Sequence, residues 1–196
     1  MWFPERGFHV SWSFWLLILL AAIVSPLTIV LSILLAAALH ECGHLLALRA
    51  FHVPIEGLRL SAFGAVLHAR GAQRLSYGRE LVVTLAGCGM NLVCGVLTAW
   101  FSLHYVWVEG FVFAGAHILL CAFNLLPIPP LDGSSIFAFF LPQKYLPQYY
   151  KVQRYAMPVF LIVVLLVPYV LRFNPIGIYL DATAGNVFDL LFSFGR

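Results

Sequence analysis

The chain alternates long apolar stretches with short polar connections along its length. Five stretches are each close to the ~20 residues that a helix needs to cross a bilayer; they cover residues 8–25, 27–50, 80–101, 109–126 and 155–171. A sixth stretch, 176–194, contains two aspartates and two glycines, so an interfacial helix fits it nearly as well as a span. The pattern predicts an all-α polytopic membrane protein with about six transmembrane helices.

Composition supports this prediction, because 62% of the residues are hydrophobic and only 10% are charged. Soluble domains have roughly 45–50% and about 25%. No hydrophilic linker of domain length interrupts the chain, so we expect residues 1–196 to form a single transmembrane domain. Basic clusters of the kind that bind nucleic acid are absent, and the lipid bilayer is the expected surrounding. The first stretch has no cleavage site typical of a signal peptide and is kept as a span.

Lys and Arg gather between the second and third stretches and between the fourth and fifth. Residues 102–110 and the Ser25-Pro26 turn carry neither. The positive-inside rule therefore predicts a multi-pass protein of the cell membrane whose N-terminus and two basic loops are cytoplasmic.

Residues 53–70 show strand character, since Leu58 and Leu60 alternate with the polar Arg59 and Ser61, and Gly64 offers a turn. A short membrane-associated β-hairpin after the second helix fits this segment. An ordinary connecting loop is the alternative.

The second apolar stretch contains a metal-binding pattern, His40-Glu41-Cys42-Gly43-His44. Residues four apart lie on one face of a helix, so His40 and His44 can bind one zinc ion while Glu41 reaches its water as general base. Three ionisable residues in an apolar span are costly unless they face a cavity or a metal. The pattern therefore predicts a zinc site within the membrane, near its cytoplasmic face.

Catalytic zinc sites commonly have three protein ligands, so a third ligand is expected. Asp132 is the best candidate, because it follows three prolines that break the fourth helix at about the depth of the two histidines. His117 lies fifteen residues before Asp132 along the sequence. If this segment is helical, His117 is too far away to share the metal, and a packed or hydrogen-bonded histidine is the better interpretation.

Two asparagines lie near the expected level of the metal. Asn91 follows the small residues Ala86, Gly87 and Gly89. It is a candidate either for binding a substrate carbonyl or for hydrogen bonding between helices. Asn124 either satisfies the carbonyl groups freed by the prolines or helps to hold substrate. The four cysteines all lie in apolar helices and are interpreted as packing residues rather than disulfides.

At these motifs the chain resembles the site-2 protease family of intramembrane zinc metalloproteases. The resemblance rests on three segments in order: His40-Glu41-x-x-His44, Ala86-Gly87-x-x-x-Asn91, and Asn124-x-x-Pro127-x-Pro129-x-Leu131-Asp132-Gly133. It implies one zinc ion per chain held by His40, His44 and Asp132, with Glu41 as general base. The Phe63-Gly64 pair resembles the family's hairpin region, which implies that residues 55–70 hold an unwound substrate by strand addition.

Within the family, the chain is most similar to the sporulation protease that processes a sigma-factor precursor. It departs from the family at Cys88, where Pro is usual, and at Ala65, where a second Gly is common. We expect neither a PDZ nor a CBS regulatory domain.

The predicted function is zinc-dependent hydrolysis of a peptide bond in or near the transmembrane segment of a membrane-associated protein. A sigma-factor precursor or an anti-sigma factor is a candidate substrate, and a membrane inhibitor or regulatory protein is a candidate partner. Two alternatives stay open, a metal transporter and an inactive relative that binds membrane helices. The transporter gives Glu41 no special task.

Overall fold

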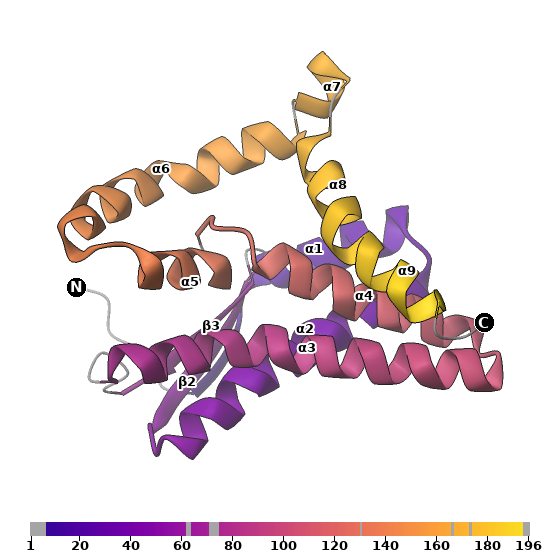
Figure 1. The fold of residues 1–196 in the computed structure, drawn as a ribbon, viewed down its shortest axis with the longest axis horizontal. Helices are drawn as coiled ribbons and strands as arrows, with labels where there is room; N and C mark the ends of the chain where they lie inside the picture. Colours follow the sequence, from indigo (N-terminus) through magenta and orange to yellow (C-terminus); the bar gives the residue numbers. More distant parts are fainter. Residues whose placement is uncertain are drawn as a thin grey trace.

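The computed structural model describes residues 7–61, 64–70, 75–129, 131–165, 167–172 and 174–193, which form a mostly helical fold with one small sheet (Figure 1). The helices are α1 (Trp12–Val24), α2 (Leu27–Ala50), α3 (Tyr77–Tyr105), α4 (Val108–Asn124), α5 (Asp132–Phe140), α6 (Leu146–Leu165), α7 (Val167–Leu171), α8 (Pro175–Leu180) and α9 (Asn186–Ser193). The strands are β1 (Gly7–Val10), β2 (Ile55–Ser61) and β3 (Gly64–Ala69).

The centre of the described fold is the bundle of α2, α3 and α4, in which each helix packs against the other two. Small residues line the places where these helices meet. A Cβ on Gly43 would lie 3.0 Å from the Cα of Gly87, and one on Gly95 would lie 3.2 Å from the Cβ of His117. Close backbone approach of this kind is typical of helices that pack inside a membrane.

Within the described ranges, two helices are long and apolar enough to cross a membrane, α2 and α3, and α1 and α4 are shorter apolar helices. Only 28% and 22% of the most apolar windows of α2 and α3 are buried, and α1 has no buried residue. Apolar side chains that face outward in this way indicate a protein that is surrounded by lipid rather than water. The predicted number of six spans is not established by these helices.

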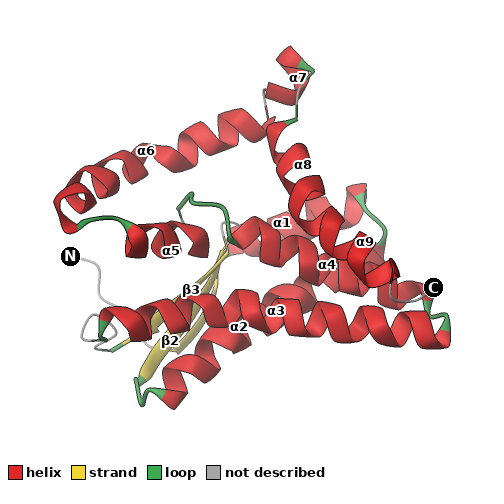
Figure 2. Cartoon of the chain, viewed as in Figure 1, coloured by secondary structure: helices red, strands yellow, loops and turns green. Residues whose placement is uncertain are grey.

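The predicted hairpin is present, and it belongs to a larger sheet than the sequence indicated (Figure 2). β2 and β3 pair antiparallel, and β1 pairs parallel with β2 on its other side. The predicted helical fold with a short hairpin is confirmed in part, and β1 is a strand that the prediction did not include. The first helix begins at Trp12 rather than at residue 8. The Ser11 backbone N–H and hydroxyl both donate to the Leu60 carbonyl, at 2.9 and 3.0 Å, which fixes the sheet to the start of α1.

The fourth apolar stretch is broken as predicted, because α4 ends at Asn124 and α5 begins at Asp132 after a turn. α6 begins at Leu146, earlier than the predicted start at residue 155.

The sixth stretch forms α8, a π-helical segment Asp181–Gly185, and α9. It packs on α4: Ala184 lies in a buried cluster with Ile118 and Ala122 of α4, and the Tyr179 hydroxyl donates to the Ala122 carbonyl at 2.9 Å.

Candidate metal centre

Three side chains from two distant parts of the sequence converge beside α3. Nε2 of His40 and Nε2 of His44 lie 3.1 Å apart, and they lie 3.1 and 3.2 Å from Oδ2 of Asp132. His40 and His44 are buried and Asp132 is half-buried. The two histidines come from successive turns of α2, and Asp132 is the first residue of α5. The structure therefore brings the three predicted ligands into one group.

The donor set and its spacing fit zinc. Ligand atoms about 2.0–2.1 Å from a tetrahedral zinc ion lie about 3.3 Å from one another. The three edges measured here are 3.1 to 3.2 Å. Two imidazoles and one carboxylate are also a common ligand set of catalytic zinc, which leaves a fourth position for water or substrate.

α3 lies unusually close to this group because it has glycine at position 87. A Cβ there would lie 2.6 Å from Cε1 of His44 and 2.7 Å from Cε1 of His40, and it would overlap Nε2 of His44. On the facing helix, a Cβ on Gly43 would overlap the Ala86 carbonyl. The small residues noted in the sequence thus allow α3 to cover the two imidazoles.

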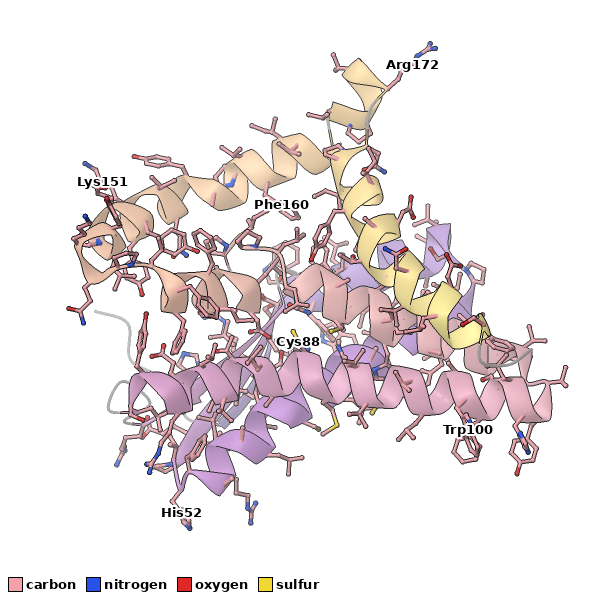
Figure 3. All side chains as sticks on the ribbon, viewed as in Figure 1. His52, Cys88, Trp100, Lys151, Phe160 and Arg172 are labelled. Carbon is pink, nitrogen blue, oxygen red and sulfur yellow. The ribbon has the colours of Figure 1, made fainter. Side chains whose placement is uncertain are left out.

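His44 is oriented by a backbone group of α3. Its Nδ1 donates to the Val83 carbonyl at 2.8 Å, which leaves the Nε2 lone pair free for a metal. The thiol of Cys88 lies 3.9 Å from Oδ2 of Asp132. Cys88 points from α3 toward the space between α4 and α5 (Figure 3). No sequence pattern indicates the Val83 contact, and the packing role predicted for Cys88 does not include its approach to Asp132. All four cysteines are free thiols.

Glu41 is half-buried on α2, next to His40 in the sequence. It is close enough to His44, His40 and Asp132 for their charges to act on its carboxylate. A half-buried carboxylate beside the two imidazoles is a candidate general base.

The predicted substrate-binding residues lie in different places. Asn91 is fully buried, and its side chain contacts His40 and His117 on two other helices. Asn124 is half-buried and donates from Nδ2 to the Leu120 carbonyl on its own helix at 3.0 Å. Gly64 begins β3 with a positive φ of 112°, and Phe63 lies outside the described residues.

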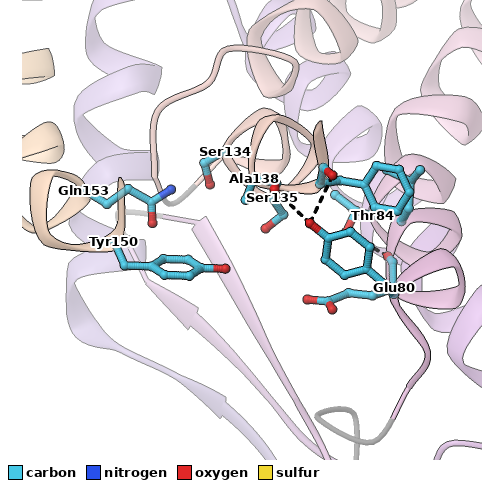
Figure 4. Close-up of a pocket in the computed structure, with 10 residues that line it drawn as sticks. Glu80, Thr84, Ser134, Ser135, Ala138, Tyr150 and Gln153 are labelled. Carbon is cyan, nitrogen blue, oxygen red and sulfur yellow. Dashed lines mark hydrogen bonds between the residues drawn. The ribbon is translucent and has the colours of Figure 1, made fainter. Parts of the chain in front are cut away.

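Residues of α3, α5 and α6 line a pocket (Figure 4). Thr84, which follows Val83 in the sequence, is one of its lining residues, and so is Ser134, two residues after Asp132. The hydroxyl of Tyr77 donates to the carbonyls of Ala138 and Phe139, at 2.8 and 3.0 Å, and so fastens the end of α5 to the start of α3.

No protein-family model matches the sequence, and no curated protein matches it. Among solved structures, the chain is similar to the site-2 protease from Methanocaldococcus jannaschii. The TM-score is 0.67 at 20% sequence identity, and the similarity covers 94% of this chain and 93% of that chain. The chain therefore has the fold of that protease along nearly its whole length.

Proposed function

We propose that this chain is an intramembrane zinc metalloprotease of the site-2 protease family. One observation carries the proposal: His40, His44 and Asp132 converge with the spacing of zinc ligands, on a fold shared with a site-2 protease. Sequence identity to that protease is 20%, and the proposed activity rests on the chemistry of the three residues.

The proposed reaction is hydrolysis of a peptide bond. Zinc held by His40, His44 and Asp132 would polarise the scissile carbonyl and make a water molecule more acidic. Glu41 accepts the proton of the attacking water and delivers it to the leaving amine. The Val83 carbonyl keeps the His44 imidazole oriented, and Asp132 is placed by its position as the first residue of α5.

A membrane helix has to unwind before its amides can be cut, because its backbone groups are bonded internally and shielded. β1 and β3 are the edge strands of the described sheet, since the order is β1-β2-β3. An edge strand pairs with an extended segment through main-chain hydrogen bonds and depends little on side-chain sequence. We assign substrate binding to this sheet, where Phe63 and Gly64 are the residues that the family resemblance indicates. Asn91 on α3 and Asn124 on α4 are the further candidates from the sequence.

The expected partners and location follow from the same proposal. The substrate is a transmembrane or membrane-associated protein, such as a sigma-factor precursor or an anti-sigma factor. The protein is a multi-pass protein of the cell membrane with a cytoplasmic N-terminus, and its active site lies near the cytoplasmic face. A membrane inhibitor or regulatory protein is a further expected partner.

The test is coexpression with candidate single-span substrates, together with zinc analysis of the purified protein. Glu41→Gln should keep about one zinc per chain and stop cleavage, whereas His44→Ala and Asp132→Ala should lose both. Glu109→Gln is the matched control, because Glu109 is an exposed carboxylate in the first turn of α4. Cleavage at the wild-type rate by Glu41→Gln would refute the mechanism. Zinc binding without cleavage of any substrate would support an inactive relative.

A further inference from the structure

A row of three buried polar side chains crosses the helix bundle behind the metal group. Nδ1 of His40 on α2 lies 3.3 Å from Nδ2 of Asn91 on α3, and Oδ1 of Asn91 lies 3.0 Å from Nδ1 of His117 on α4. His40 is 5% exposed, and Asn91 and His117 are 0% exposed. Polar groups buried in an apolar bundle are costly unless they are paired, so this row calls for an explanation beyond packing.

A metal-binding imidazole needs a hydrogen-bond acceptor at its second ring nitrogen. Nε2 is the atom of His40 that faces His44 and Asp132. When Nε2 of a neutral imidazole binds a metal, the ring carries its proton on Nδ1, and that N–H needs an acceptor. Asn91 is the side chain in contact with Nδ1. His44 meets the same demand with the Val83 carbonyl.

The carboxamide of Asn91 can provide this acceptor if it rotates. Rotation by about 180° exchanges Oδ1 and Nδ2 with little change of shape. Oδ1 of Asn91 then accepts from His40 Nδ1–H, and Nδ2 donates to Nδ1 of His117. His117 has to present an unprotonated Nδ1 in this arrangement, so its own proton moves to Nε2. The row therefore has one consistent direction of hydrogen bonds when His40 is a metal ligand.

The far end of the row supports a role for His117 in this direction. Among the described residues, Nε2 of His117 is buried without a hydrogen-bond partner. The ring is held edge-on against Phe113, with centroids 4.5 Å apart and planes at 87°. An unpaired buried nitrogen destabilises a fold. Since a leucine would avoid that cost, the benefit of a histidine lies at Nδ1, the atom that contacts Asn91.

We infer that Asn91 and His117 are positioning residues of the metal centre, a hydrogen-bonded row that holds the His40 ring with Nδ1 protonated and Nε2 directed at the metal. The inference rests on the metal site of the proposed function, and it makes Asn91 a support for a ligand rather than a group that touches substrate. His117 acts only through Asn91.

The experiment measures zinc affinity of the full chain in detergent, by competition with a chelating indicator, and the absorption spectrum of the cobalt-loaded protein. Asn91→Leu should weaken zinc binding about 10–100-fold, as loss of a partner behind a metal ligand commonly does. Asn91→Asp keeps an acceptor for His40 and should bind zinc at least tenfold more tightly than the Leu variant. His117→Leu should weaken binding a few-fold, and His117→Gln, which still accepts from Asn91, should restore it.

Two comparisons separate positioning from a structural role. Ser102→Ala is the control, because Ser102 is another fully buried polar residue of α3 whose hydroxyl donates to Thr98 on its own helix, at 2.7 Å. It should leave zinc affinity and the cobalt spectrum unchanged. The double variant Asn91→Leu/His117→Leu should bind zinc no more weakly than Asn91→Leu alone.

Additive losses in the double variant, or no loss in His117→Leu beyond that of Ser102→Ala, would overturn the role of His117. Wild-type affinity in Asn91→Leu would overturn the whole row. A wild-type protein that binds no zinc would instead contradict the proposed function. If Asn91→Leu does not fold, the pair His117→Leu and His117→Gln still decides the question.

Discussion

Gly87→Ala adds one methyl group, and we expect it to disturb the metal centre. The added Cβ would lie 2.7 Å from Cε1 of His40 and 2.6 Å from Cε1 of His44, and it would overlap Nε2 of His44. Ordinary van der Waals contact begins near 3.4 Å, so each ring, or α3 itself, has to shift by about 0.7 Å or more. Both rings would have to move together, because they form one group with Asp132.

The magnitude follows from overpacking in a close-packed site. An extra methyl group in such a site costs about 1–3 kcal/mol. If the imidazoles absorb the shift, this cost opposes the geometry that the metal requires. At about 1.4 kcal/mol for each factor of ten, zinc binding should weaken by about 5- to 150-fold. If α3 absorbs the shift instead, the same cost appears as a lower thermal stability.

The assay is chelator competition for zinc and thermal unfolding, both measured beside Gly89→Ala. Gly89 lies on the same helix, and a Cβ there would meet nothing within 4 Å. The two variants change composition and helix propensity in the same way, so their difference isolates the contact with the imidazoles. Equal zinc affinity and equal stability in the two variants would refute the reasoning.

Three further predictions concern the sheet, the pocket and the topology. Leu67→Pro should reduce cleavage strongly and leave zinc content unchanged. The pairing Ser61↔Gly64 closes the hairpin, and the alternation of the ladder from there turns the Leu67 N–H toward the free edge of β3, where a substrate strand would bind. Normal cleavage would show that the hairpin is only a connector. Tyr77→Phe keeps the stacking on Phe139 but loses both hydrogen bonds to α5. Zinc affinity, measured by chelator competition, should therefore fall a few-fold. An unchanged affinity would show that α5 is held in place without these two hydrogen bonds. In a background without other accessible thiols, Lys144→Cys should be labelled from the cytoplasm and Val106→Cys from outside, and the reverse pattern would contradict the orientation.

The closeness of His40 and His44, the two proposed ligands on α2, could be predicted from sequence because their relation is local. A helix places residues four apart on one face whatever surrounds it, so His40 and His44 needed only the prediction of helix. Asp132 needed one more step, the estimate of depth along a helix broken by prolines. The structure places its carboxylate beside both imidazoles, and no other described His, Cys, Asp or Glu belongs to that group of possible ligands.

The contacts that depend on how helices rotate against one another could not be predicted. Asn91 was expected near the metal's level, but sequence does not say which way an asparagine on α3 faces, and its contacts with His40 and His117 depend on three helices at once. β1 was missed for another reason. A four-residue strand is too short for an alternation of polar and apolar residues to show, and its pairing partner β2 lies some fifty residues later.

The three ligands also differ in how much of the fold each one depends on. His40 and His44 stay together as long as α2 is a helix, whereas Asp132 reaches them only if α5 begins at the right place. Several contacts determine that place: Gly133 fits against the Leu125 carbonyl with no room for a Cβ, Tyr77 holds the carbonyls at the far end of α5, and the hydroxyl of Tyr149 donates to the Ser134 carbonyl at 2.9 Å. Two of these three contacts lie at the pocket between α3, α5 and α6, because Tyr77, Ser134 and Ala138 line it. Asp132 is therefore the proposed ligand whose own helix lines this pocket, and changes there should act on the metal mainly through α5 and Asp132. Thr84, next to Val83, offers a second route through His44.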